Sequence, residues 1–301
     1  MGRHWLLAFA IVTFAPSAHA SPLDDCRQEE DLTLAISGCS ALIAQAPGDA
    51  AARILRGDAY RASGDPTRAL ADYAKAIEIN PRDAEAYYRR GTVYRQQNNL
   101  SRAVEDFTKA IDIDPKQYGA YFARAEIRRE KGDLANALSD YDAAIAINPR
   151  ATWAYLSRGA VYQAKGDAAR AVADYTKAVD INPLGADAYF ARANALRGMG
   201  SFEKAISDYT RVIEIRPSDA DAYNNRAWAY YSLGEPVRAL EDARKALQIR
   251  PFDAYALDTR GHVFEILGRR NEAILDYRMA IRLNPDIESS KEGLKRLGAN
   301  H

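Results

Sequence analysis

The sequence predicts an all-α solenoid of helix–turn–helix repeats, and three observations lead to this prediction. Each 34-residue unit contains two groups of small and large residues. A glycine or asparagine lies between the two groups, and a helix can end at these residue types. Within each group the spacing of three and four residues places the side chains on one helical face. Prolines recur with a fixed period of 34, which indicates a repeat architecture, at Pro47, Pro81, Pro115, Pro149, Pro183, Pro217, Pro251 and Pro285.

The first segment, residues 1–20, is a predicted secretory signal. Arg3 gives the positive start, residues 5–14 form an apolar core, and residues 18–20 read Ala-His-Ala, a cleavage site of small residues. The apolar run is too short for a bilayer span, which needs about 20 residues. We expect cleavage after Ala20, a periplasmic or secreted protein, and no membrane insertion after cleavage. An uncleaved anchor is the alternative.

Residues 21–49 are predicted to form an N-terminal cap. Residues 29–46 match only the second helix of a repeat, so they form a half-repeat that covers the first full copy. Cys26 and Cys39 lie here, and in an oxidising compartment an isolated pair favours a disulfide. A loop of this length contributes about 3 kcal/mol of stability.

Seven copies of the 34-residue unit fill residues 50–287, and a short helix is expected to close the array at residues 288–301. Position 8 of each copy is glycine or alanine, position 20 is alanine, and position 24 is aromatic in six copies. Positions 4, 8 and 11 share one helical face, as do 20, 24 and 27, so each copy is two amphipathic helices. The copies span 50–83, 84–117, 118–151, 152–185, 186–219, 220–253 and 254–287.

This set of residues resembles the tetratricopeptide repeat family, whose pattern has the same length, small residues at 8, 20 and 27, an aromatic at 24 and proline at 32. The resemblance implies a right-handed superhelix whose concave face is lined by the first helix of each pair. This chain departs from the family's pattern at position 4, which is tyrosine in five copies rather than tryptophan, Arg53 in the first copy and Leu257 in the last. It also departs at Arg128, position 11 of repeat three, and at Ala243, position 24 of repeat six. Repacking is expected at those two seams.

Arginine at position 7 and aspartate at position 23 recur together in all seven copies, at the edge of the predicted core. Unpaired charges there would be costly, so we expect an Arg–Asp pair joining the helices of each repeat. An anion-binding arginine ladder is the alternative. The expected pairs are Arg56–Asp72, Arg90–Asp106, Arg124–Asp140, Arg158–Asp174, Arg192–Asp208, Arg226–Asp242 and Arg260–Asp276.

A second stripe on each first helix, at positions 2, 5, 9 and 12, is not needed by the core. Large apolar side chains on such a face suggest an interaction surface. Packing along the seams between repeats is the alternative. The lysines with which some family members bind chaperone C-termini are absent from positions 2 and 5. The predicted partner-binding residues are Tyr88, Phe122, Trp153, Leu156, Phe190, Asn225 and Trp228.

Composition and motifs favour a binding protein over an enzyme. The chain carries 41 basic and 41 acidic residues with no block of one sign, so no nucleic-acid partner is expected. It has no phosphate-binding glycine loop, nucleophile elbow or metal-ligand cluster, so we expect no catalysis, cofactor or metal. We predict an exported scaffold that binds a protein or peptide noncovalently in its concave groove. A self-assembling structural array and an accessory subunit of a cell-envelope enzyme are the alternatives.

Overall fold

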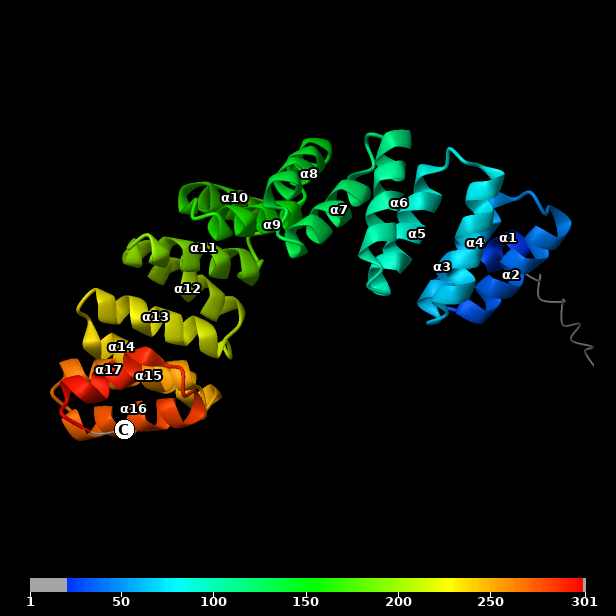
Figure 1. Cartoon of the computed structure of the whole chain (residues 1–301). Coiled ribbons are helices and arrows are strands. Elements are labelled where there is room, and N and C mark those ends of the chain that lie inside the picture. The colour runs from blue at the N-terminus through cyan, green and yellow to red at the C-terminus, as the bar shows by residue number, and fades with distance from the viewer. Residues whose placement is uncertain (1–20, 300–301) are drawn as a thin grey trace, which may run out of the picture. The chain divides into compact units, whose positions relative to one another are not determined.

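The computed structural model describes residues 21–299; the predicted leader, residues 1–20, lies outside the described part. The described residues form seventeen α-helices in consecutive packed pairs, with no strand among them (Figure 1). The predicted all-α solenoid of helix pairs is therefore confirmed. The chain divides into two compact units, Met1–Ala120 and Tyr121–His301, which are called unit 1 and unit 2 below.

Unit 1 contains the N-terminal cap and the first two repeats. Its helices are α1 (Pro22–Cys26), α2 (Leu32–Gln45), α3 (Ala50–Ala62), α4 (Pro66–Ile79), α5 (Ala84–Gln96) and α6 (Leu100–Ile113). Each helix packs against the next along the chain up to α6.

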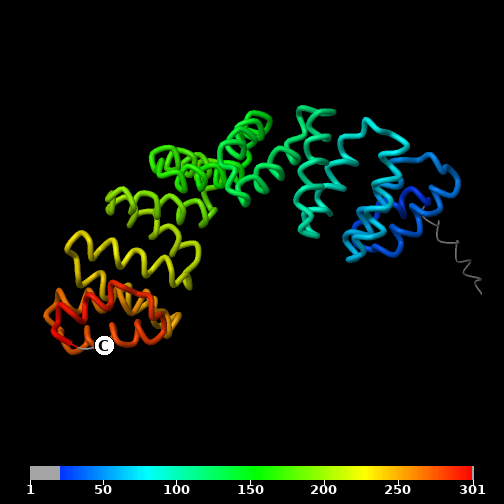
Figure 2. The backbone as a smooth tube through the Cα atoms, in the orientation of Figure 1, coloured from blue at the N-terminus to red at the C-terminus, as the bar shows by residue number. Residues whose placement is uncertain are grey.

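Unit 2 contains repeats four to seven, most of repeat three and the C-terminal cap. Its helices are α7 (Tyr118–Glu130), which begins just before the unit boundary, α8 (Leu134–Ile147), α9 (Thr152–Ala164), α10 (Ala168–Ile181), α11 (Ala186–Gly198), α12 (Phe202–Ile215), α13 (Ala220–Ser232), α14 (Pro236–Ile249), α15 (Ala254–Ile266), α16 (Arg270–Leu283) and α17 (Glu288–Arg296). The backbone trace turns back on itself between consecutive helices, as in the yellow part of the chain from α13 to α14 (Figure 2).

The turn inside each repeat is set by the residue at position 15. Glycine adopts a positive φ of 71–80° there in six repeats, and Asn98 does so with φ 58° in the other. This left-handed conformation ends the first helix at little steric cost for these residue types. The second helix then begins at a capping aspartate such as Asp65 or Asp167. Ser201 occupies the same position, but its side chain makes no capping hydrogen bond.

The two helices of a repeat pack through the position-24 ring. Tyr175, for example, is buried against Gly159, where a Cβ atom would lie only 2.7 Å from the ring. A small residue at position 8 therefore lets the aromatic ring lie directly on the first helix. In repeat six Ala243 replaces the ring and remains buried. In repeat three Arg128 turns to Asp140, with a nitrogen–oxygen distance of 2.7 Å.

The N-terminal cap contains one helix more than the half-repeat that the sequence predicts. Ser21 and Asp24 form a reciprocal capping box, and Pro22 occupies the first turn, so α1 begins where its sequence favours a helix. A disulfide between Cys26 and Cys39 joins the end of α1 to the middle of α2. The two cysteines are buried at this junction.

The C-terminal cap is α17, which lies over the last repeat. Its Leu294 is fully buried in a cluster with Val263 and Tyr277. The helix therefore covers apolar surface that the last repeat would otherwise expose, as expected for a terminal unit of a repeat array.

Successive first helices in unit 2 also contact one another: α9 with α11, α11 with α13, and α13 with α15. Among the described residues, no comparable contact joins α10 to α12 or α12 to α14. The first helices therefore form the inner side of this stack. In the described part of the chain, no helix is both long and apolar enough to cross a membrane.

Candidate functional site

The inner face of unit 2 is formed by α9, α11, α13 and α15, and four predicted binding residues on it are half-buried. Leu156 on α9 packs between two clusters that also include residues of α10 and α11. Phe190 on α11 meets Tyr209 of its own repeat edge-on, with ring centroids 5.9 Å apart, and contacts a cluster that includes Ala222 of the next repeat. These side chains therefore contribute to the seams between repeats and retain part of their surface.

Two further predicted residues at the same repeat position behave alike. Phe122 on α7 is half-buried and lies 6.0 Å from the Tyr141 ring. In unit 1, the half-buried Tyr88 lies 5.9 Å from the Phe107 ring, and a Cβ on Gly119 would be 2.7 Å from it. Burial raises the pKa of the Tyr88 hydroxyl. Position 5 thus packs against position 24 in these repeats.

Trp153 differs from the other predicted residues because it projects into solvent from the first turn of α9. Its side chain is 63% exposed, whereas its neighbour Leu156, one turn further along, is half-buried. An exposed tryptophan beside a partly exposed leucine provides an apolar edge to the inner face.

A group of polar side chains lies on α11 and α13, next to Phe190 in sequence and space. The Oδ1 atom of Asn194 accepts hydrogen bonds from the Tyr209 hydroxyl, at 2.6 Å, and from Nδ2 of Asn225, at 3.3 Å. In the described residues, Oδ1 of Asn224 and Nε of Arg197 are buried and have no hydrogen-bond partner. Three other buried atoms of the described residues also lack a hydrogen-bond partner: Nε of Arg53, Nε of Arg129 and Nε2 of His262.

Asn225 is one of the binding residues predicted from the sequence, whereas Asn194, Asn224 and Arg197 are not in that set. Asn224 and Arg197 occupy positions 5 and 12 of the predicted stripe, and Asn194 occupies position 9. Polar character alone does not distinguish a binding side chain, since surface helices carry many such residues. The burial of Asn224 Oδ1 and Arg197 Nε without a hydrogen-bond partner is seen only in the folded structure.

Trp228 belongs to an aromatic group near the C-terminal end of the inner face. Its ring centroid is 5.1 Å from that of Tyr231 and 5.6 Å from that of His262. Asp258, one turn before His262, is buried and accepts hydrogen bonds from the hydroxyls of Ser289 and Ser290 near the start of α17. The C-terminal cap therefore covers the inner face of repeat seven.

The position-7 arginines and position-23 aspartates lie together in every repeat. Nε and one terminal nitrogen of each arginine donate to the two carboxylate oxygens at 2.6–3.0 Å. The aspartates are only 3–6% exposed. Bidentate pairing of this kind satisfies both oxygens of a buried carboxylate, and it commits Nε and one terminal nitrogen of each arginine to that carboxylate rather than to a bound anion.

The described residues contain no group of three or more His, Cys, Asp or Glu side chains arranged to hold a metal ion.

Comparison with known proteins identifies the repeat throughout the chain. One model described as tetratricopeptide repeat matches residues 28–84, 54–118, 88–152, 122–187, 156–219 and 190–254. A second model with the same description matches residues 254–287. No curated protein matches the chain.

Several solved structures share the fold. YrrB, described as a TPR protein with an unusual peptide-binding site, is 26% identical, with a TM-score of 0.57 over 62% of this chain and 95% of its own. A tetratricopeptide repeat protein from Parabacteroides merdae is 24% identical, with a TM-score of 0.57 over 83% of this chain and 98% of its own. A protein fragment from Cytophaga hutchinsonii is 18% identical, with a TM-score of 0.64 over 76% and 94%.

Proposed function

Since the chain belongs to the tetratricopeptide repeat family, we propose that it is an exported, noncatalytic scaffold that binds a segment of a partner protein on the inner face of unit 2. The observation that carries this proposal is the row of half-buried apolar, aromatic and amide side chains on successive first helices, Leu156, Phe190, Asn225 and Trp228, with the exposed Trp153 at its edge. An extended peptide offers side chains for the apolar surface and a backbone N–H and carbonyl for the amide groups.

Apolar side chains of this row share their helices with polar side chains. Phe190 lies on α11 with Arg197, and Trp228 lies on α13 with Asn224. Each retains accessible surface after packing in its seam. A few polar groups set among apolar and aromatic side chains are typical of peptide and ligand sites. YrrB, at 26% identity, is described as having a peptide-binding site, which supports the same class of ligand here.

Export is part of the proposal and rests on the leader-like residues 1–20 and on the disulfide. Disulfides persist in oxidising compartments, and Cys26 and Cys39 are joined in this chain. We propose the periplasm or the cell exterior as the location. Mass spectrometry of the protein recovered from those fractions is expected to give Ser21 as the first residue. A chain retained inside the cell with residues 1–20 intact would contradict this part of the proposal.

Site-specific photo-crosslinking tests the binding face. A photoreactive phenylalanine at Trp153, which is 63% exposed, is expected to give a discrete protein adduct. The matched control is Val237 on the second helix α14, which is 65% exposed. An adduct from position 153 that is absent from position 237, and weaker in an Asn224→Ala background, supports the inner face. Equal adducts from both positions would contradict it.

A further inference from the structure

The seams between repeats share a stacking arrangement on the side of the second helices. In repeats one, two, four and six, the ring at position 11 lies near the guanidinium of position 7 and that of position 19. In repeat seven, Arg269 at position 16 takes the second place. The Tyr162 ring centroid is 6.0 Å from Cζ of Arg158 and 4.9 Å from Cζ of Arg170. The Tyr230 ring is likewise 5.9 Å from Arg226 and 5.5 Å from Arg238. Each ring is thus held by cations from both sides.

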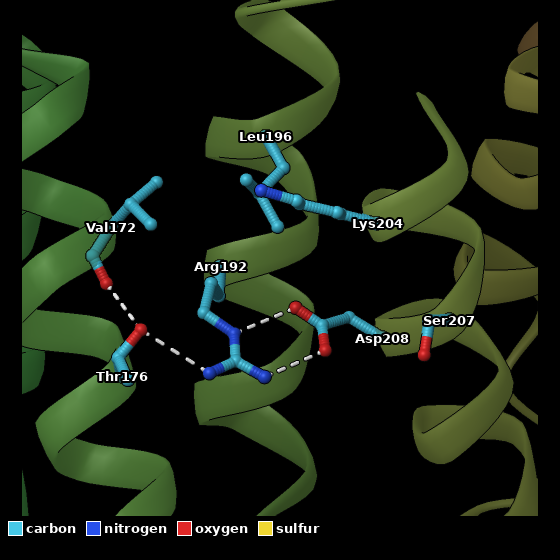
Figure 3. A pocket seen from close by; sticks show the side chains of 7 residues that line it. All are labelled: Val172, Thr176, Arg192, Leu196, Lys204, Ser207 and Asp208. Carbon is cyan, nitrogen blue, oxygen red and sulfur yellow. Dashed lines mark hydrogen bonds and ion pairs between the residues drawn. The ribbon is translucent and has the colours of Figure 1, made fainter. Parts of the chain in front are cut away.

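Repeat five departs from this arrangement in two residues at once. Position 11 is Leu196 instead of an aromatic residue, and position 19 is Lys204 instead of arginine. The result is a pocket of about 350 Å³ among α10, α11 and α12, where the neighbouring seams hold a ring (Figure 3). The pocket is lined by Val172, Thr176, Arg192, Leu196, Lys204, Ser207 and Asp208.

Repeat three also lacks the ring but has a substitute of its own. Arg128 occupies position 11 there, and its guanidinium bonds to Asp140 at 2.7 Å. No corresponding side chain is present in repeat five, because the buried leucine is too short to reach the space between Arg192 and Lys204. The residues around the pocket therefore define the group that fits it, which is a planar ring between two cations.

We propose that this pocket binds an aromatic side chain from an acidic segment of a partner protein. The ring takes the place that tyrosine fills in the adjacent repeats, over Leu196 and beside Arg192. A neighbouring carboxylate of the same segment pairs with the ammonium group of Lys204, which extends from α12 toward Leu196 (Figure 3). Within the described residues, Lys204 makes no hydrogen bond or ion pair, whereas Arg192 is already paired with Asp208 at 2.7 Å.

This site is distinct from the inner-face site proposed above. Its walls are the second helices α10 and α12 and the part of α11 that faces them, and none of the predicted stripe residues lines it. Binding in this pocket can therefore be tested separately from binding on the inner face.

The test uses the peptide acetyl-Glu-Tyr-Glu-amide as the probe, with methyl NMR of the whole chain as the readout. We expect saturable shifts of the Leu196, Val172 and Thr176 methyl groups, with a Kd on the order of 1–10 mM for so small a ligand. Acetyl-Glu-Ala-Glu-amide, which lacks the ring, is expected to give no saturable shift at these methyl groups. Absence of saturation with the tyrosine peptide, or equal binding of the alanine peptide, would overturn the proposal.

Two variants separate this pocket from general peptide binding. Leu196→Tyr restores the residue found in the neighbouring repeats, so it fills the pocket with the chain's own ring and is expected to abolish the shifts of Val172 and Thr176. Lys204→Glu is expected to weaken binding of the acidic peptide about two- to fivefold, which is the size of effect that an exposed charge pair gives. The same variant is expected to bind acetyl-Lys-Tyr-Lys-amide more tightly than the acidic peptide.

Both variants lie at positions that tolerate change: tyrosine is the usual residue at position 11, and Lys204 is exposed. Thermal unfolding checks that each remains folded. Unchanged binding of the tyrosine peptide by folded Leu196→Tyr would show that the ring binds elsewhere and would refute the inference.

Discussion

Each position-23 aspartate is a buried, charged carboxylate. Such a charge is tolerated in the interior only because an arginine donates hydrogen bonds to both carboxylate oxygens. Asp106 illustrates this most simply, since Arg90 is its only ion-pair partner among the described residues. The hydrogen bonds that Arg90 donates to Asp106 raise the pKa of the Arg90 guanidinium. Arg158, by contrast, also bonds to Asp142 at 2.6 Å, so its removal would disturb two carboxylates.

A double-mutant cycle at Arg90 and Asp106 is therefore the cleaner measurement. Arg90→Leu alone leaves a buried carboxylate unpaired and is expected to lower the free energy of unfolding by about 3–5 kcal/mol. Arg90→Leu with Asp106→Leu removes both charges and is expected to recover much of that loss. Urea unfolding of the three variants gives the coupling. Single variants as stable as the wild type would instead indicate a pair of the weak, solvent-screened kind.

His262 is a second buried titratable residue, and its burial makes the stability of the protein depend on pH. Burial among Trp228, Tyr231 and Tyr277 lowers the pKa of its imidazole below the usual 6.5, against the opposing effect of Asp258. Other charges also face the ring: Glu265 from α15 opposes the lowering, as does Glu292 from α17, and Arg296 from α17 favours it.

The sign of the pH effect follows from the lowered pKa. Above pH 6.5 the histidine is neutral in both the folded and unfolded chains, so its contribution is constant. Below 6.5 the unfolded chain takes up a proton first, so stability is lost as the pH falls. At pH 5.5 the loss reaches up to about 1.4 kcal/mol relative to pH 7.5. Chemical unfolding at the two pH values should show this loss in the wild type and a smaller one in His262→Gln; equal slopes would disprove the assignment.

Residue-scale predictions from the sequence depended on recurrence. Arg56 and Asp72 have counterparts in all seven copies, so the two charges could be expected to meet. The half-burial of Tyr88 could not be foreseen from its own repeat, because the ring lies against Gly119 of the next one. Asp258 occupies position 5 of the predicted stripe, yet it is buried and accepts hydrogen bonds from Ser289 and Ser290 of the closing segment. The repeat pattern does not predict the contacts made by a segment outside it, such as the closing helix.

At the scale of elements, α1 shows the same limit. The sequence predicts a disulfide in the cap, and the structure contains it, but the helix that carries Cys26 matches no part of the repeat pattern. Its five residues are too few to be stable alone. The contacts between α1 and α2, together with the disulfide, hold it in place.

Reduction of the disulfide is therefore expected to act locally. Opening the Cys26–Cys39 loop removes about 3 kcal/mol of stabilisation by the chain-entropy estimate. We expect faster amide exchange in α1 and α2, measured by hydrogen–deuterium exchange with mass spectrometry, and little change in α14–α16. A Cys26→Ser, Cys39→Ser variant without reductant should reproduce the pattern. Unchanged exchange in α1 would show that packing alone fixes this helix.

At the scale of the whole molecule, the fold was predictable because the two helices of every repeat pack together through the same positions. Thirty-four residues with a small position 8 and an aromatic position 24 specify one helix pair, and seven copies specify a stack. The candidate site was less predictable. Buried atoms without partners at Asn224 and Arg197, and the pocket over Leu196, arise from differences between copies, and their effect appears only when neighbouring helices are in place.

The stability of such a stack should likewise be a sum of local terms, and α17 provides the test. Leu294 is completely buried against the last repeat, so Leu294→Ala is expected to cost about 2–5 kcal/mol. Because repeats contact only their neighbours, amide exchange should rise in α15 and α16, less in α13 and α14, and not at all in α3–α6. Lys295→Ala, at an exposed position of the same helix, is the control. A uniform rise across all helices would instead mean that the array unfolds as a single cooperative unit, and that the seams couple the repeats more strongly than a nearest-neighbour sum allows.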